Sequence, residues 1–250
     1  MSNLPASRTP DERGACATGQ SCPKKGLGWR LIARLLIVFV ADILLLFLPA
    51  GSWNFWQGWA QLIAYFLPAT LIYLYFYKHD PQVVDRRMQN KETVVEQKFL
   101  TLFFAPLFLG AYMLPGFDHR WGWSRSLLGP VPLWLSLLAL AIVCASFLAL
   151  FWVLKVNAFA SRTIQVETGQ KVISTGPYRI VRHPMYSASI VLWLSTPLAL
   201  GSWIALPFFA LLTPFYAIRL HNEEKILREQ LPGYPDYCLR TRYRLIPFVW

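Results

Sequence analysis

Two short polar segments in the C-terminal part of the chain hold most of the side chains that could do chemistry. The first, Ser174 to Tyr186, reads STGPYRIVRHPMY and carries His183 between two apolar stretches. The second, Arg219 to Glu224, follows after a mainly apolar stretch. Arginine can bind a carboxylate through two hydrogen bonds, and histidine and glutamate can exchange protons. We expect a polar binding site at the place where the two segments meet.

Glycine and proline residues predict how the first segment is held. Gly176 and Pro177 form a turn signal. Pro184 directly follows His183; it disfavours helical geometry at the histidine and suits the first turn of a following helix. The segment is therefore predicted to be a loop that delivers His183 and Tyr186 to the mouth of a helix.

The second segment is predicted to be a cytosolic helical extension of an apolar span. Arg219 and Glu223 are four residues apart on one helical face, and Glu224 and Arg228 form a second such pair. Ordinary surface pairs of this kind are worth only a few tenths of a kcal/mol. The order of charges is favourable in the second pair and poorer in the first. We therefore interpret the first pair as functional. For the second pair, an ordinary structural ion pair is at least as good an explanation as a functional role.

The basic and aromatic residues after Gly233 allow two interpretations. They include Tyr243 and Arg244 and run into the closing sequence Leu245-Ile246-Pro247. As a tail facing solvent or lipid they would form a surface for anionic headgroups. Alternatively, they close over a ligand.

The composition indicates an integral membrane protein. Of the 250 residues, 55% are hydrophobic and only 15% are charged, whereas soluble domains are about 25% charged. The net charge of +11 comes from residues that flank apolar spans, which argues against a nucleic-acid partner. Four scattered cysteines form no CxxC pair, so neither a metal site nor a disulfide framework is expected.

Six apolar stretches predict an all-α membrane fold. Gly26 and Gly28 form only a GxG fragment with no strand before it, so it does not indicate the dinucleotide loop of a Rossmann domain. The last two are short and joined by Gly201-Ser202, as in a tilted pair or a re-entrant hairpin. Residues 78–98 and 155–182 carry five Lys or Arg each, and residues 49–55 carry none. The positive-inside rule therefore places both termini in the cytoplasm. The predicted spans are Trp29 to Leu48, Trp56 to Tyr77, Phe99 to Leu114, Leu133 to Leu154, Tyr186 to Leu200 and Trp203 to Ile218.

Apart from Arg30 at its start, two ionisable residues lie inside the first predicted span. Arg34 is close enough to its cytosolic end to extend toward the lipid headgroups. Asp42 is deeper, and a carboxylate within a membrane is a functional candidate by default. The alternative, which we favour, is an inward-facing residue hydrogen-bonded to a neighbouring helix.

Four ordered blocks carry a family resemblance. They are GPYRIVRHPMY, RLHNEE, LPGYPDY and RYRLIPF, all within about residues 155 to 250. Together they resemble the integral membrane methyltransferases of the isoprenylcysteine carboxyl methyltransferase family and, more distantly, the phospholipid methyltransferases. The resemblance divides the chain into a tail (1–28), N-terminal transmembrane helices (29–154) and a catalytic core (155–250).

The resemblance implies an enzyme that uses S-adenosyl-L-methionine and methylates a lipid-linked acceptor, most simply the carboxylate of an isoprenylcysteine-like substrate. Arg219 would meet the acceptor, and His183 would be the second catalytic residue. For an amine acceptor, His183 or Glu224 would be the candidate base. The residues implied to line the cofactor are Gln170, Lys171, Val172, Ile173, Tyr178, His183, Pro184, Met185, Tyr186 and Glu223.

Three other functions stay open at this point. The first is N- or O-methylation of a phospholipid or other small lipid. The second is a reductase that uses NADPH, because sterol reductases share the Arg-His-Pro block, although they are substantially longer. The third is a non-catalytic lipid-binding protein of the same fold. The compact chain and short polar tail suggest a bacterial inner membrane, and no oligomeric state is predicted.

Overall fold

The computed structural model describes residues 26–88, 95–159 and 169–250, and within these ranges it contains helices and no strand. The predicted tail 1–28 lies almost entirely outside the described residues. The helices are α2 (Leu27–Ala50), α3 (Trp56–His79), α4 (Pro81–Met88), α5 (Val95–Trp121), α6 (Trp123–Leu127), α7 (Leu133–Val156), the 3₁₀ helix η1 (Gly176–Arg179), α8 (Pro184–Ala199), α9 (Ala205–Ala210), α10 (Thr213–Gln230) and α11 (Tyr234–Arg240).

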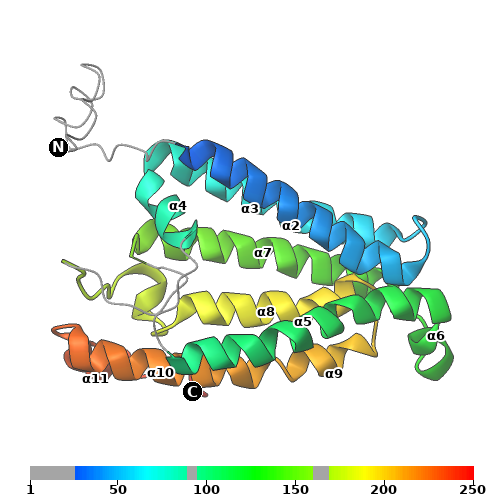
Figure 1. The fold of residues 1–250 in the computed structure, drawn as a ribbon. Helices are drawn as coiled ribbons and strands as arrows, with labels where there is room; N and C mark the ends of the chain where they lie inside the picture. The colour runs from blue at the N-terminus through cyan, green and yellow to red at the C-terminus, as the bar shows by residue number, and fades with distance from the viewer. Residues whose placement is uncertain (1–25, 89–94, 160–168) are drawn as a thin grey trace.

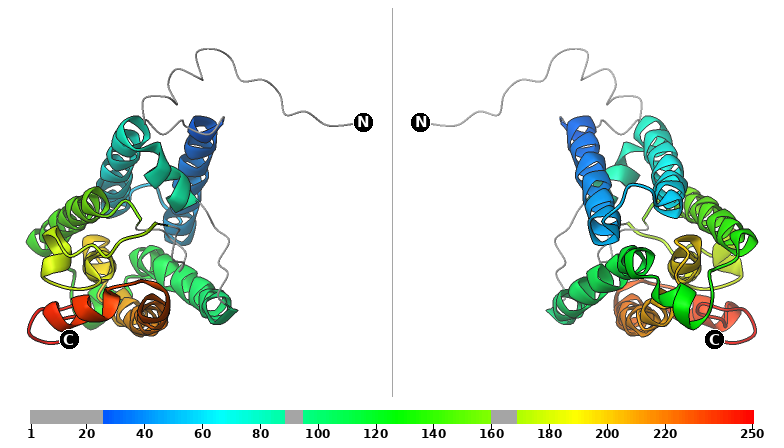
Figure 2. Two further views of the ribbon diagram at one scale, coloured as in Figure 1. Left: turned by 90° about the vertical axis from the view of Figure 1, so that its left-hand side faces the viewer. Right: turned by 90° about the vertical axis from the view of Figure 1, so that its right-hand side faces the viewer.

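The long helices run side by side, so that the molecule has two distinct ends (Figure 1). The α2–α3 connection and α6 lie at one end, and α4 and α11 lie at the other. Seen along the helices in Figure 2, α2 and α3 lie at the top of the view, and α5 and α10 lie at the bottom. The helix α7 packs along α8, and α2 packs along α5.

Three of the described helices, α2, α3 and α7, are long and apolar enough to cross a membrane. Each has 24 residues, which corresponds to about 36 Å at 1.5 Å per residue. The predicted starts at Trp56 and Leu133 are confirmed, and α2 begins two residues before the predicted Trp29. The chain is an integral membrane protein, and the full count of six spans stays a prediction.

The sixth predicted span is not one continuous helix. The chain turns at Leu211 and Leu212, which separate α9 from α10. Pro214 lies in the first turn of α10, where its missing N–H costs nothing but where it cannot continue a preceding helix. The helix α10 then runs past the predicted end at Ile218, so the expected helical extension is present.

A buried carboxylate fixes the end of the molecule that holds α6. Asp118, near the end of α5, accepts hydrogen bonds from the backbone N–H of Ser124 at 2.7 Å and from the hydroxyls of Ser124 and Ser202. Ser202 lies in the turn between α8 and α9. These bonds hold the turn between α8 and α9 against α5. The chain then returns through α9 and α10 toward the opposite end of the molecule.

Arg34 and Asp42 of α2 both differ from expectation. Arg34 donates from Nη1 to the carbonyl of Met88 at 3.2 Å, so it helps to hold the end of α4. Asp42 is half-buried and lies near Tyr65 and Tyr112, but it forms no hydrogen bond with a described residue. The predicted hydrogen bond to a neighbouring helix is therefore wrong within the described part of the chain.

Candidate functional site

The first polar segment has the predicted loop-to-helix geometry. Gly176 has φ 58°, in the left-handed region that favours glycine, and it opens the short helix η1. His183 precedes Pro184 as the N-cap residue of α8, with φ −125° and ψ 62°. The imidazole is therefore held outside the helix and is 6% exposed.

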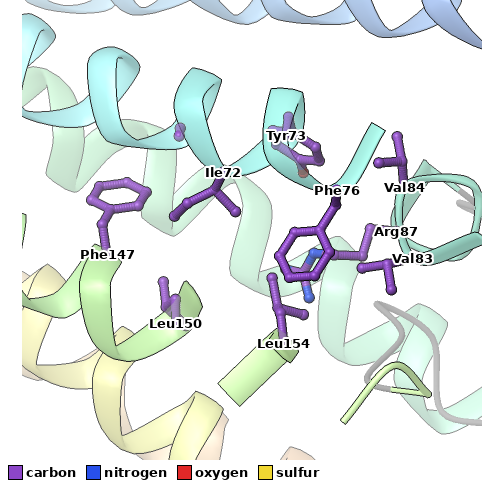
Figure 3. Close-up of a pocket in the computed structure, with 10 residues that line it drawn as sticks. Ile72, Tyr73, Phe76, Val83, Val84, Arg87, Phe147, Leu150 and Leu154 are labelled. Carbon is purple, nitrogen blue, oxygen red and sulfur yellow. The ribbon is translucent and has the colours of Figure 1, made fainter. Parts of the chain in front are cut away.

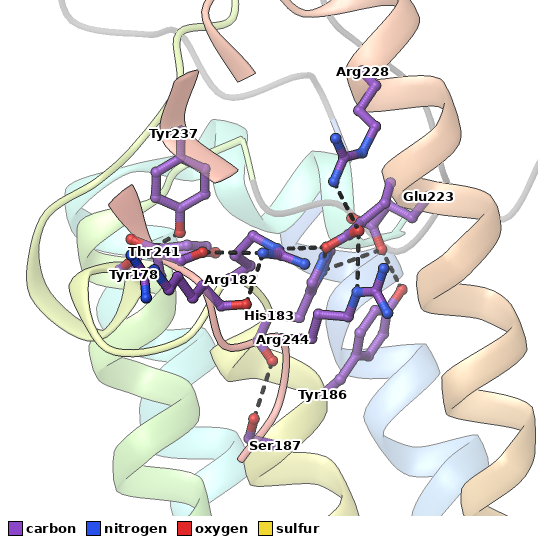
Figure 4. Close-up of polar contacts among 12 residues, drawn as sticks. Tyr178, Arg182, His183, Tyr186, Ser187, Glu223, Arg228, Tyr237, Thr241 and Arg244 are labelled. Atoms are coloured by element: carbon purple, nitrogen blue, oxygen red, sulfur yellow. Dashed lines mark hydrogen bonds and ion pairs between the residues drawn. The ribbon is translucent and has the colours of Figure 1, made fainter. Parts of the chain in front are cut away.

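The two polar segments meet through Tyr186 (Figure 4). The hydroxyl of Tyr186 donates to Oε2 of Glu223 at 2.6 Å and accepts a hydrogen bond from Nε of Arg219 at 3.0 Å. Nδ1 of His183 lies 4.0 Å from the same glutamate oxygen. Four side chains singled out in the sequence are thus brought together at one place, between the start of α8 and the middle of α10.

Glu224 faces a different set of partners from its neighbour. Oε1 accepts a hydrogen bond from Nε of Arg182 at 2.6 Å and lies 3.4 Å from Nε2 of His183. Oε2 lies 3.3 Å from Nε of Arg244 and 3.7 Å from Nη2 of Arg228. The expected helix pair with Arg228 exists, but it is the longest of these contacts. The dominant contact is the buried pair with Arg182, a residue to which the sequence analysis assigned no role.

This environment keeps Glu224 ionised. Burial alone would raise its pKa, but hydrogen bonds from His183 and Arg182 and their positive charge outweigh it and lower the pKa to about 2. A carboxylate with so low a pKa is a weak base at neutral pH. The geometry therefore argues against Glu224 as the base for an amine acceptor.

Residues 241–245, here called the C-terminal strap, run along the first polar segment. The backbone N–H groups of Arg182 and His183 donate to the carbonyls of Tyr243 and Arg244 at 2.9 and 3.0 Å. Nη1 of Arg182 also donates to the carbonyls of Thr241 and Arg242. Part of the basic tail therefore packs against the loop that holds His183. The interpretation of the basic tail as only a surface for lipid headgroups therefore does not hold for the strap.

The predicted cofactor segment Gln170 to Ile173 has no regular secondary structure. Val172 and Tyr178 pack against a cluster formed by residues around α11. The Tyr178 hydroxyl accepts a hydrogen bond from Nδ2 of Asn157 at 2.9 Å, and burial raises the pKa of this tyrosine to about 12. The backbone groups of Lys171, Val172 and Ile173 form no hydrogen bond with any described residue. They are available to the polar edge of a ligand.

Pro184 and Met185 are the first two residues of α8. Pro184 is buried in the first turn of α8. The sulfur of Met185 accepts a hydrogen bond from Nη1 of Arg87, on α4, at 3.6 Å. Met185 therefore faces α4, whereas its neighbour Tyr186 faces α10.

The residues present fit the predicted cofactor, S-adenosyl-L-methionine. The hydroxyl of Tyr234 is buried and forms no hydrogen bond with a described residue. Glu223 supplies a partly exposed carboxylate, which can accept hydrogen bonds from a ribose diol. Within the described residues, no three His, Cys, Asp or Glu side chains are grouped as a metal site requires. The site also includes aromatic rings, since the Tyr186 ring stacks on His183 with a centroid distance of 5.7 Å.

Comparison with known proteins agrees with the sequence resemblance. Residues 131–232 match the family model of the phospholipid methyltransferases, a range that includes His183, Arg219 and Glu223. A Delta(14)-sterol reductase of Mus musculus is 33% identical over 92 residues, which are 35% of this chain and 22% of that relative. The chain thus spans less than a quarter of the length of this curated relative.

A solved structure also aligns with this chain. It is that of the eukaryotic intramembrane Ras methyltransferase, an isoprenylcysteine carboxyl methyltransferase. The alignment has a TM-score of 0.46 at 17% sequence identity, and it covers 88% of this chain and 87% of that one.

Proposed function

We propose that this chain, an integral membrane protein in which residues 131–232 match the phospholipid methyltransferase family, transfers a methyl group from S-adenosyl-L-methionine to a lipid-linked acceptor. The observation that carries the proposal is the link from Arg219 through Tyr186 to Glu223. It joins the two motif segments beside His183, at the start of a helix. We place this site at the cytoplasmic face, in keeping with the charge distribution.

The proposed cofactor site uses both polar segments. Glu223 accepts hydrogen bonds from the ribose hydroxyls, and the backbone groups of Lys171, Val172 and Ile173 bind the adenine edge. Gln170 and Tyr178 border this part of the site, and His183, Pro184, Met185 and Tyr186 line the part nearest α8. When bound, the cofactor supplies a methyl carbon that its sulfonium group already activates.

The proposed acceptor is a carboxylate, such as that of an isoprenylcysteine-like compound. A carboxylate is already ionised at pH 7, so no base is needed. Arg219 holds one acceptor oxygen and orients the other, and catalysis is mainly positioning and exclusion of water. The arginine is itself held by Tyr186, which fixes the direction of its guanidinium group.

The match to phospholipid methyltransferases supports a second candidate, methylation of a phospholipid amine. An amine must lose a proton before it attacks. The low pKa of Glu224 leaves His183 as the candidate base in this case. The imidazole lies between Glu223 and Glu224, with Nδ1 4.0 Å from the first and Nε2 3.4 Å from the second.

The test separates cofactor binding from acceptor binding. In calorimetry with the detergent-purified protein, Glu223→Gln should weaken S-adenosyl-L-methionine binding about tenfold or more, because hydrogen bonds to a charged group are lost. Arg219→Ala should retain cofactor binding but lower methyl transfer to a prenylated carboxylate about a hundredfold. Arg219→Lys is the matched variant, since it keeps the charge without the two-pronged geometry.

Three results would count against this scheme. No cofactor binding by the folded parent would favour a lipid-binding protein or a reductase. NADPH binding in its place would point to the reductase, as the similarity to a sterol reductase allows. Transfer to phosphatidylethanolamine but not to the carboxylate would establish the second candidate.

A further inference from the structure

The hydroxyl group of Tyr186 lies between two residues that are proposed to bind different substrates. It donates to Oε2 of Glu223, the proposed ligand of the cofactor ribose, at 2.6 Å (Figure 4). It also accepts a hydrogen bond from Nε of Arg219, the proposed ligand of the acceptor, at 3.0 Å. One oxygen atom therefore contacts a residue of each proposed binding site.

The ring of Tyr186 is held from two sides. It stacks on the imidazole of His183, with the two planes 17° apart, and it meets the ring of Tyr216 edge-on at 5.8 Å. A phenol has one proton to donate, so the bond to Glu223 directs that proton and leaves the oxygen lone pairs toward Arg219. Because the ring is fixed, a change that orients the hydroxyl at Glu223 also affects its bond with Arg219.

Met185, the residue before Tyr186, faces a different part of the molecule. Its sulfur accepts a hydrogen bond from Arg87, and Arg87 also lines an apolar cavity of about 90 Å³ between α3, α4 and α7 (Figure 3). The residues that line this cavity include Tyr73 but neither Glu223 nor Arg219. A substitution in the cavity wall can therefore serve as a control for altered packing near the site.

Both hydrogen-bond partners of Tyr186 are long side chains that are not fully enclosed. The side chain of Glu223 is 27% exposed, and Arg219 is half-buried. Holding such a side chain in one rotamer costs conformational entropy. When ribose hydroxyls bind Glu223, they fix its carboxylate, and the hydroxyl of Tyr186 and the guanidinium group of Arg219 are fixed with it. The ligand that binds second then meets a smaller ordering cost.

We propose that Tyr186 couples the two substrate sites, so that the cofactor and the acceptor each strengthen the binding of the other. This rests on the proposed function and gives Tyr186 a positioning role, because it acts through Arg219 on the acceptor. The coupling is reciprocal, with the same factor in both directions. A factor of about fivefold is expected for a single hydrogen-bonded link, at the low end of the usual range for coupled sites.

Calorimetry on the full-length protein in nanodiscs measures this coupling factor. The probes are S-adenosyl-L-homocysteine, which has no methyl group to transfer, and a prenylated carboxylate, S-farnesyl-thiopropionic acid. S-adenosyl-L-homocysteine also lacks the sulfonium charge, so direct attraction of the sulfonium for the carboxylate does not contribute. The parent should bind each probe about fivefold more tightly when the other is saturating.

Tyr186→Phe removes the hydroxyl and keeps the ring, so its coupling factor should fall to about one. The matched control is Tyr73→Phe, which removes the same atom from the wall of the apolar cavity and should keep the parent's factor. Looser packing alone would weaken each affinity without changing the coupling factor. A coupling factor in Tyr186→Phe equal to that of the parent would overturn the proposal.

A second measurement uses the parent alone and does not depend on the folding of a variant. The probe is an analogue of S-adenosyl-L-homocysteine that lacks both ribose hydroxyls, which are the groups that Glu223 is proposed to bind. At saturation it should leave the affinity for the prenylated acid unchanged, whereas S-adenosyl-L-homocysteine raises that affinity about fivefold. Equal effects of the two compounds would show that the coupling does not begin at Glu223, and the proposal would be wrong.

Methyl transfer to the same acid, measured on the same samples, separates this proposal from the proposed function. If methyl transfer occurs but the parent binds the two probes independently, the methyltransferase stands and the coupling proposal falls. If the coupling depends on Tyr186 while no methyl is transferred, the linked sites stand and the proposed reaction falls. A folded parent that does not bind S-adenosyl-L-homocysteine would overturn both.

Discussion

Glu224 is a buried carboxylate, 3% exposed, with three arginines and one histidine around it. Arg182 is itself buried and uses its remaining donors on carbonyls of the C-terminal strap. Arg182 therefore depends on Glu224 for the counter-charge that this buried pair supplies. Breaking a buried pair leaves an uncompensated charge, which is far more costly than losing a surface pair.

We predict that Glu224→Gln lowers the free energy of unfolding by about 3 kcal/mol, because Arg182 loses its counter-charge. Unfolding in mixed SDS and detergent micelles would measure the change. The control is Arg228→Gln, since Arg228 is 45% exposed and 3.7 Å from the carboxylate, and it should cost under about 1 kcal/mol. Equal effects of the two substitutions would contradict the buried-pair interpretation.

The Glu224 carboxylate should also make the stability of the protein depend on pH. The folded-state pKa of Glu224 is lowered from 4.5 to about 2, so its contribution is fully present above pH 4.5 and is lost as the pH falls toward 2. Thermal unfolding followed between pH 7 and pH 3 should show a falling Tm below about pH 4.5. Glu224→Gln should show a flatter curve over that window, and a parallel curve would assign the acid sensitivity to other carboxylates.

At the level of elements, the C-terminal strap and the start of α8 support one another. Ser187, in the first turns of α8, donates to the carbonyl of Leu245 at 2.7 Å. The backbone of His183 bonds to the adjacent strap residue Arg244. The strap therefore fixes the loop from which His183 extends.

We predict that Ser187→Ala weakens cofactor binding about fivefold, which corresponds to the loss of one hydrogen bond of about 1 kcal/mol. The matched control is Ser189→Ala, because Ser189 bonds only within its own helix, to the carbonyl of Met185 at 2.9 Å. It should leave the affinity within a factor of two of the parent. Calorimetry with S-adenosyl-L-methionine measures both, and equal affinities would show that the strap does not position the site.

The sequence predicts these elements better than it predicts their contacts. Long apolar stretches determine α2, α3 and α7, and the proline after His183 determines where α8 begins. The sequence places Glu223 and Arg219 on one helical face, and the structure adds Tyr186, whose hydroxyl bonds to both residues. The pairing of Glu224 with Arg182 joins residues 42 positions apart, and no local periodicity reports such a contact. The break between α9 and α10 was signalled by Pro214 alone, within an otherwise apolar run.

On the scale of the whole molecule, the two ends differ in chemistry. The end with α4 and α11 carries the basic segments and the proposed site (Figure 1). The opposite end carries the α2–α3 connection, with no Lys or Arg in residues 49–55, and the buried Asp118 cluster. An excess of Lys and Arg in short loops marks the cytoplasmic side, so the proposed site should open toward the water-soluble cofactor.

We predict that the two ends are labelled from opposite sides of the membrane. Asn54, exposed in the α2–α3 connection, and Gln230, exposed at the end of α10, are each changed to cysteine after the native cysteines are replaced by serine. A membrane-impermeant maleimide should label Asn54→Cys in intact cells and Gln230→Cys only after permeabilisation. The reverse pattern would place the site on the far side of the membrane from cytosolic S-adenosyl-L-methionine, and it would overturn both the predicted orientation and the proposed reaction. Labelling of both in intact cells would indicate two orientations, which a positive-inside bias this strong should prevent.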